Sequence, residues 1–279
     1  MTEQIYPCLW FDTQAKAAAE FYCSVFPNSK ITHESPIVVH WELNGKKIMG
    51  LNGGPVFKIN PSISLYVNCG SVNATNEIWN KLIEGGKALM PIDKYPWSER
   101  YGWLQDKFGM TWQLTAPIMD DAKFGLSPSL LFTGKRFGRA EEAVNFYCSL
   151  FPPSSKEVLI HYPEQDANAG KVMFSEIKLN GYNLIAMDGP GEHAYTFNEG
   201  VSFVLTCADQ KEIDHYWNEL TTDGGAESRC GWCVDKFGIS WQVIPSILGK
   251  LMADPEKGPR VVQAFLKMKK FEIQKLLDA

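Results

Sequence analysis

Short stretches of the chain alternate between apolar and polar residues, which is the pattern of β-strands with one buried face. Residues 62–67 read SISLYV, so the apolar side chains share one face while Ser64 and Tyr66 share the other. Residues 110–114 read MTWQL and place Gln113 on a polar face in the same way. The strands therefore predict sheets with one apolar face covered by helices and one mixed, more polar face.

Residues 15–26 and 72–83 carry apolar residues three and four positions apart, which is the spacing of an amphipathic helix. A strand precedes each of these helices, and more strands follow it. The predicted order over the first repeat is strand, helix and strands, written twice: 6–11, 15–26, 37–43 and 47–51, then 62–67, 72–83 and 111–114.

The second half of the chain repeats the first in the same order. FYCSVFP at 21–27 returns as FYCSLFP at 146–152, and ISLYVNC at 63–69 returns as VSFVLTC at 201–207. Four strand–helix–strands units in series predict an α+β fold in which helices cover one face of each sheet.

The repeats set the expected domain boundaries, which are 1–120 and 127–247, with a linker at Asp120–Leu126. The remaining residues, 248–279, predict a C-terminal helical tail. Its lysines are diluted by acidic residues, so we expect a docking helix or a dimerisation arm in preference to a helix on a membrane surface.

One stretch, RCGWCVDKFGISWQV at 229–243, contains two cysteines with the spacing of redox pairs and zinc sites. Its counterpart in the first repeat, YGWLQDKFGMTWQL at 101–114, has Leu104 in place of the second cysteine. Asp-Lys-Phe-Gly predicts a hairpin connection. Residues three apart on a strand then lie roughly 10 Å apart on opposite faces. Cys230 and Cys233 are therefore not expected to form a disulfide.

Composition narrows the functional classes. The 279 residues are 45% apolar and 21% charged with a net charge of −5, which is typical of a soluble globular protein and disfavours nucleic-acid partners. No apolar run approaches the roughly 18–20 residues of a membrane span, and the N-terminus lacks a signal-peptide pattern. Seven cysteines, an odd number, do not suggest a secreted disulfide framework, so we expect a cytoplasmic protein without membrane contact.

Four longer motifs stand out: LWFDTQAKAAAEFYCSVFPNSKI, LNGGPVFKI, YGWLQDKFGMTWQL and CGW…DKFGISWQVIP. Together they resemble the PhnB-like family, also labelled 3-demethylubiquinone-9 3-methyltransferase-like, of the vicinal oxygen chelate (glyoxalase/bleomycin resistance/dioxygenase) superfamily. The resemblance implies tandem vicinal-oxygen-chelate domains, four βαβββ modules in all. It also implies that their cupped sheets of mixed and antiparallel strands surround a small-molecule site.

In metalloenzymes of this superfamily, His and Glu ligands come from the first and last strands of each module. The resemblance places the corresponding positions at Pro7, Asn52, Ser62 and Gln113, and at Pro128, Asp188, Gly200 and Gln242. These side chains are poor ligands for a catalytic divalent ion, so we expect no metal and no other cofactor. The methyltransferase label also lacks support, because no strand-to-helix Gly-rich loop is followed by an acidic residue for a ribose.

Pairing outward from the two hairpin turns sets Trp103 opposite Gln113 and Trp232 opposite Gln242. A glutamine and a tryptophan that recur together suit a pocket with an aromatic lining and few polar groups. The alternatives are that the glutamines bond backbone at the sheet end and that the tryptophans fill a core or an interface. The residues expected to bind the ligand are Phe11, Asn52, Ser62, Tyr66, Trp103, Gln113, Asp188, Ser202, Trp232 and Gln242.

The leading hypothesis for function is metal-independent binding of a small aromatic or amphipathic molecule. The alternative is an enzyme of the same fold, a lyase, dioxygenase or group-transfer enzyme, with non-standard ligands such as Asp188 and histidines. A third reading is that one repeat has lost its pocket, so that the chain is a monomer imitating a dimer, or forms a homodimer. Whether a reaction is catalysed stays open, and fold does not decide it.

Overall fold

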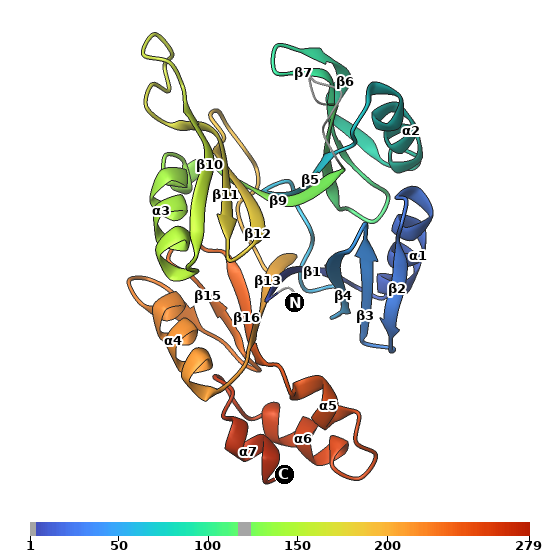
Figure 1. Cartoon of the computed structure of the whole chain (residues 1–279), viewed down its shortest axis with the longest axis vertical. Helices are drawn as coiled ribbons and strands as arrows, with labels where there is room; N and C mark the ends of the chain where they lie inside the picture. Colours follow the sequence, from blue (N-terminus) through green and yellow to red (C-terminus); the bar gives the residue numbers. More distant parts are fainter. Residues whose placement is uncertain (1–3, 117–123) are drawn as a thin grey trace. The chain divides into compact units, whose positions relative to one another are not determined.

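The computed structural model describes residues 4–116 and 124–279 (Figure 1). The predicted linker Asp120–Leu126 lies outside the described residues as far as position 123. Its last two residues, Gly125 and Leu126, already belong to strand β9.

The elements in chain order are β1 (Ile5–Phe11), α1 (Ala15–Val25), β2 (Lys30–Glu34), β3 (Val38–Leu43), β4 (Lys46–Asn52), β5 (Ile63–Asn68), α2 (Val72–Leu82), β6 (Lys87–Tyr95), β7 (Ser98–Gln105), β8 (Thr111–Ala116), β9 (Gly125–Phe132), a 3-10 turn (Gly134–Arg136), α3 (Ala140–Leu150), β10 (Ser154–His161), β11 (Val172–Leu179), β12 (Tyr182–Asp188), β13 (Val201–Cys207), α4 (Gln210–Thr221), β14 (Ala226–Glu227), β15 (Trp232–Val234), β16 (Ser240–Pro245), α5 (Leu248–Met252), α6 (Gly258–Phe265) and α7 (Ile273–Leu277).

The chain divides into two compact units. Unit 1 comprises the residues up to Cys8 together with Ser202–Ala279, and unit 2 comprises Leu9–Val201. Unit 2 therefore takes in most of the first repeat and the first module of the second. The domain boundaries expected from the sequence repeat remain a prediction.

An eight-stranded sheet lies wholly within unit 2, in the order β10-β11-β12-β9-β5-β8-β7-β6. Its two central strands, β5 and β9, pair antiparallel from Ile63 opposite Leu130 to Asn68 opposite Gly125. The second module of the first repeat and the first module of the second repeat are thus joined edge to edge. Figure 1 shows this sheet bent, with β10–β12 and β6–β8 on its two sides and with α3 and α2 on its outer face.

The remaining strands form smaller groups within each unit. In unit 2, β2, β3 and β4 form an antiparallel meander. In unit 1, β14, β15 and β16 are antiparallel, and β16 pairs parallel with β13. Helix α4 and the tail helices α5–α7 belong to the same unit, so the predicted helical tail is confirmed. Among the described residues, no helix is both long enough and apolar enough to cross a membrane.

The predicted faces of the first hairpin are confirmed. Trp103 pairs with Gln113, and Leu104 pairs with Trp112. A Cβ added to Gly102 would clash with the Trp79 ring of α2, so the face that Gly102 shares with Leu104 lies under this helix. Trp112 belongs to that face and is fully buried, as the alternation predicted.

A buried carboxylate explains why Asp-Lys-Phe-Gly recurs with a tryptophan three residues later. Asp106 Oδ1 accepts hydrogen bonds from the backbone N–H groups of Phe108 (2.8 Å) and Met110 (3.0 Å). Its Oδ2 accepts from Trp112 Nε1 and from the Tyr22 hydroxyl of α1, both at 2.8 Å. The motif therefore builds a turn and fixes the core tryptophan against it.

The second repeat builds the same turn around Asp235. This carboxylate accepts from the N–H groups of Phe237 and Ile239 and from Trp241 Nε1, at 2.9–3.0 Å. The cysteine pair of the second repeat has no redox partner in this arrangement. Cys230 and Cys233 are both free thiols, and Cys233 is a buried core residue, as expected.

Candidate functional site

A connected group of polar and aromatic side chains covers the face of the unit 2 sheet that points away from α2 and α3. Gln113 on β8 accepts a hydrogen bond at Oε1 from the Tyr101 hydroxyl on β7, at 2.8 Å. Its Nε2 donates to Ser129 Oγ on β9 over a long 3.4 Å. Beside them, Trp103 Nε1 donates to Ser64 Oγ at 3.1 Å. We call this surface the open face and define it by Ser64, Tyr66, Tyr101, Trp103, Gln113, Ser129, Phe174 and Glu176.

Aromatic rings continue across the open face and onto the β6–β7 hairpin. The Tyr66 ring lies 6.0 Å from the Phe174 ring of β11, centroid to centroid. Tyr101 lies 5.7 Å from Tyr95 and 5.8 Å from Trp97, and these last two rings stack at 5.1 Å. Trp97 at the hairpin tip is 54% exposed. The rings thus run from a half-buried surface out to solvent.

Burial keeps the hydroxyl groups of the open face neutral. It raises the pKa of Tyr66, where a hydrogen bond to Thr115 opposes the rise and the Glu176 carboxylate adds to it. Burial also raises the pKa of Tyr101, with smaller contributions from Tyr66 and Tyr95. Both phenols therefore act as hydrogen-bond donors at neutral pH, and not as bases.

Four of the ten predicted ligand residues meet on this sheet face. Tyr66, Trp103 and Gln113 belong to the open face, and Ser62 precedes Ser64 by two residues on the same side of β5. Gln113 is only 5% exposed, yet among the described residues its amide nitrogen has just the long contact to Ser129. The hairpin register predicted from the sequence correctly placed Trp103 and Gln113 side by side on this face.

Three other predicted residues form the corresponding set in unit 1. Gln242 Nε2 donates to Ser202 Oγ at 3.0 Å, and Trp232 is the cross-strand partner of Gln242. Cys8 contacts this pair, and burial raises the pKa of its thiol to about 12. The set lacks the rings of unit 2, because Val204 and Cys230 stand at the positions of Tyr66 and Tyr101 in the repeat.

Asn52 and Asp188 were also predicted ligand residues, but their side chains cap the N-termini of helices. Asn52 Oδ1 accepts from the first backbone N–H of α1, that of Ala15, at 2.9 Å. Asp188 Oδ1 accepts from the N–H groups of Gly138 (2.7 Å) and Ala140 (3.2 Å) at the start of α3. The last residue of each module's sheet therefore caps that module's own helix. These two side chains do not join the open face.

The second polar atom of each capping side chain predicts a measurable asymmetry. Asp188 Oδ2 accepts from the N–H of Val172 (2.9 Å), whereas Asn52 Nδ2 donates to the carbonyl of Pro36 (2.9 Å). Asp188→Asn places an N–H group against another N–H group and should lower the free energy of unfolding by about 1–2 kcal/mol. Urea unfolding measures this change. The reciprocal variant Asn52→Asp should also destabilise, and a neutral effect of both would contradict the capping role.

Phe11, the last predicted ligand residue, lies on the helix side of its strand. A Cβ at Gly50 would lie 3.3 Å from its ring and 3.1 Å from the Cβ of Ala15 in α1. The same correction applies to Pro128, which pairs with the helix-facing Leu65. Placing Pro7 and Pro128 at the cup positions was therefore wrong by one residue, and a slip of one residue exchanges the two faces of a strand.

The open-face residues that were not among the predicted ligand residues are Ser64, Tyr101, Ser129, Phe174 and Glu176. The alternation in GLSPSLLF at 125–132 could have identified Ser129, because it sets the serines opposite the leucines. Phe174 and Glu176 come from β11, and nothing local predicts that this strand lies in the same sheet as β5. His33 and His40 pair across β2 and β3, with ring centroids 5.6 Å apart.

The donor set of the open face does not fit the divalent metal of the superfamily's metalloenzymes. With the register corrected, the first and last strands supply Ser129, Ser64 and Gln113, whose neutral oxygens are weak ligands. Across residues 4–116 and 124–279, no three His, Cys, Asp or Glu side chains gather closely enough to hold an ion. No step through a metal can be built from these residues.

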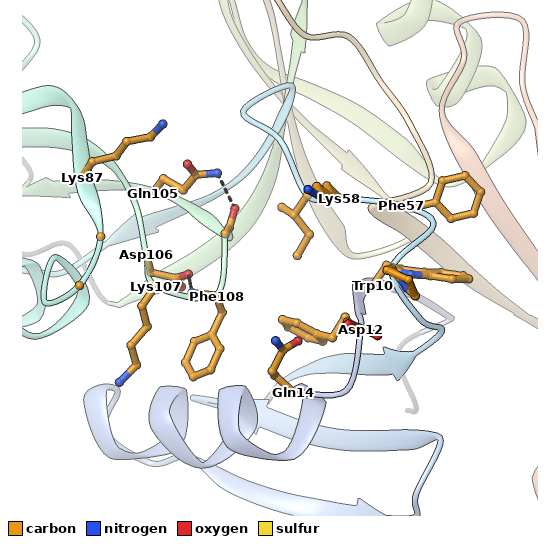
Figure 2. A pocket seen from close by; sticks show the side chains of 16 residues that line it. Trp10, Asp12, Gln14, Phe57, Lys58, Lys87, Gln105, Asp106, Lys107 and Phe108 are labelled. Atoms are coloured by element: carbon orange, nitrogen blue, oxygen red, sulfur yellow. Dashed lines mark hydrogen bonds between the residues drawn. The ribbon is translucent and has the colours of Figure 1, made fainter.

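A cavity of about 690 Å³ lies elsewhere in unit 2, beside the start of α1 and the β7–β8 turn (Figure 2). Several of its polar groups are already committed to the fold. The Asp106 carboxylate holds its turn, Gln105 Nε2 donates to the carbonyl of Gly109 (3.0 Å), and Lys107 Nζ lies 4.1 Å from the Phe21 ring centroid. Of the predicted ligand residues, Phe11 alone lines it. The open face is the better candidate site.

Sequence comparison decides the family. The family model for 3-demethylubiquinone-9 3-methyltransferase matches residues 3–115 and again residues 125–244. The chain belongs to this family. The two matches confirm that the family's domain is present twice in tandem, as the repeat predicted. No curated protein matches the sequence.

Solved structures similar to this family member fall into two groups. A PhnB protein from Bacillus cereus, whose description carries the methyltransferase name, is 34% identical over 41% of this chain and 99% of its own, with a TM-score of 0.40. A protein from Staphylococcus aureus is 30% identical over 41% and 96%, with a TM-score of 0.20. Glyoxalase I from Zea mays is 11% identical over 85% and 89%, with a TM-score of 0.54. This last similarity shows the vicinal-oxygen-chelate fold in a two-repeat chain and nothing about activity.

Proposed function

We propose that this family member binds a small aromatic or amphipathic molecule on the open face of unit 2 without a metal ion. The observation that carries the proposal is the buried Gln113 amide at the centre of a ring-lined surface. Its Oε1 accepts from the Tyr101 hydroxyl, and among the described residues its Nε2 has only the long 3.4 Å contact to Ser129. A ligand carbonyl or hydroxyl would give this N–H group a better partner.

The surroundings of Gln113 supply the apolar part of such a site. Tyr66, Phe174 and Trp103 are half-buried rings on the same sheet face, and rings of this kind stack on flat ligands. Unit 1 keeps the glutamine but not the two tyrosines. We therefore assign binding to the open face of unit 2 rather than to the set around Gln242.

The family's name refers to methyl transfer to 3-demethylubiquinone, which contains a flat quinone ring. A ring of this type suits the open face. Methyl transfer itself is not proposed, because no Gly-rich loop between a strand and a helix is present for the common class of S-adenosylmethionine enzymes. The free thiols of all seven cysteines agree with a cytoplasmic setting, which forms part of the same proposal.

The test is calorimetric titration of wild type and of Gln113→Ala with small phenols, quinols and aromatic amines. Gln113→Ala should weaken binding by about tenfold, the value of one lost hydrogen bond in a desolvated site. Gln242→Ala is the matched control in unit 1 and should bind as wild type does. Thermal unfolding of each variant checks that the fold is intact. Equal losses in both variants, or no loss in Gln113→Ala, would contradict the assignment.

A further inference from the structure

One acidic side chain stands among the rings of the open face. Glu176 on β11 is half-buried and lies two residues after Phe174 on the same side of the strand. Its cross-strand partner is Ile185 on β12, which in turn pairs with Ser129 on β9. Two strand spacings, roughly 10 Å, therefore separate Glu176 from the serine that contacts Gln113.

The charge of Glu176 acts on Tyr66. Its carboxylate is one cause of the raised pKa of Tyr66, whose ring contacts Phe174. Glu157 adds negative charge nearby, and Lys178 opposes it from the same strand. Asn183 Nδ2 donates to Glu176 Oε1 at 3.3 Å and holds the carboxylate in place. The face thus joins the negative surfaces of several aromatic rings to a partly desolvated carboxylate.

We infer that the ligand of the open face is an organic cation, an aromatic amine or quaternary ammonium compound, whose ring stacks on Tyr66 and whose positive nitrogen lies beside Glu176. This inference rests on the proposed function and names its ligand class. Ring faces attract a cation through their quadrupole, and the attraction grows when the cation is desolvated. A carboxylate within reach adds charge attraction, whereas an anionic ligand would be repelled.

The test compares probes of one shape and different charge on the full chain. The probes are benzyltrimethylammonium, its neutral carbon isostere neopentylbenzene, benzenesulfonate as an anion, and hydroquinone as a neutral quinol. In wild type, the cation should bind about tenfold more tightly than the neutral isostere, as measured by tryptophan fluorescence and calorimetry. Glu176→Gln should remove most of that preference and leave neopentylbenzene binding unchanged.

Glu20→Gln is the matched control, since Glu20 is an exposed glutamate on α1. It should retain the wild-type preference for the cation. Tighter binding of neopentylbenzene, hydroquinone or benzenesulfonate would overturn the charge assignment while leaving the proposed function in place. A preference that survives in Glu176→Gln would also overturn it. Failure of every probe to bind wild type would overturn the proposed function, and the charge assignment with it.

Discussion

Asp106→Asn is expected to lower the free energy of unfolding by about 3 kcal/mol. Asp106 is 4% exposed and accepts four hydrogen bonds, two from backbone N–H groups and two from side chains. Asparagine has one oxygen for these four donors, and its NH₂ group would face the other pair. Two buried donors would lose their acceptor, and each loss costs about 1–3 kcal/mol.

Three further variants separate the carboxylate's role from that of any single bond. Tyr22→Phe removes one hydrogen bond to Asp106 and should cost about 1 kcal/mol. Asp235→Asn affects the same turn in the second repeat and should resemble Asp106→Asn. The exposed Asp93→Asn should be nearly neutral. Guanidinium-induced unfolding measures all four, and an Asp106→Asn effect no larger than that of Tyr22→Phe would contradict this account.

The Asp106 turn also shows why a motif that recurs need not be catalytic. Burial raises the pKa of Asp106, and hydrogen bonds from Trp112, Tyr22 and the turn backbone oppose the rise. A perturbed carboxyl at the edge of a cavity is often a functional group. Here the four hydrogen bonds of the carboxylate hold the turn, the core tryptophan and Tyr22 of α1 together. Its recurrence therefore follows from the hairpin that places Trp103 and Gln113 on the open face.

The sequence predicted best what is set by nearby residues. The faces of β5 and β8 and the pairing of Trp103 with Gln113 follow from alternation and from one turn, and the structure confirms both. Leu104 and Cys233, at equivalent hairpin positions, are both core residues, also as expected. Such local features have few alternatives, because the period of a strand fixes the face of every residue once one is known.

The sequence did not predict which strands pair when they are far apart along the chain. The antiparallel pairing of β5 with β9 joins two repeats through backbone hydrogen bonds that no side-chain pattern announces. The open face therefore gained Phe174 and Glu176 without any local signal. Pro128 was misplaced for a different reason. It shares the helix side of β9 with Leu126 and Leu130, whereas the family's ligand position requires the open face. Asp188 was taken as a ligand residue although its partners are the backbone at the start of α3.

The C-terminal tail carries the other large expected effect, and Phe271 is its central residue. Phe271 is 1% exposed, and a Cβ added to Gly231 would clash with its ring. In the first repeat, the equivalent space above Gly102 is filled by Trp79 of α2. The tryptophan at the corresponding position in α4, Trp217, instead donates its indole N–H to Glu227 (2.9 Å). The tail thus supplies the ring that the second repeat's own helix does not.

Backbone and side-chain hydrogen bonds hold this tail segment in unit 1. The N–H groups of Cys230 and Gly231 donate to the carbonyls of Met268 (2.9 Å) and Lys269 (2.7 Å). Gln210 Nε2 donates to the carbonyl of Phe271 (3.0 Å), and its Oε1 accepts from the N–H of Ile273 (2.8 Å). The segment is therefore part of the folded core of unit 1.

Phe271→Ala should accordingly destabilise unit 1 by about 3–4 kcal/mol, because it removes a fully buried ring and leaves a cavity over Gly231. Leu266→Ala, at a tail residue that is 50% exposed, is the matched control and should cost less than about 1 kcal/mol. Hydrogen exchange resolved by residue should show the loss of protection in β15, β16 and α4. Equal losses of stability in the two variants would contradict this account, because Phe271 would then contribute no more than an exposed tail residue.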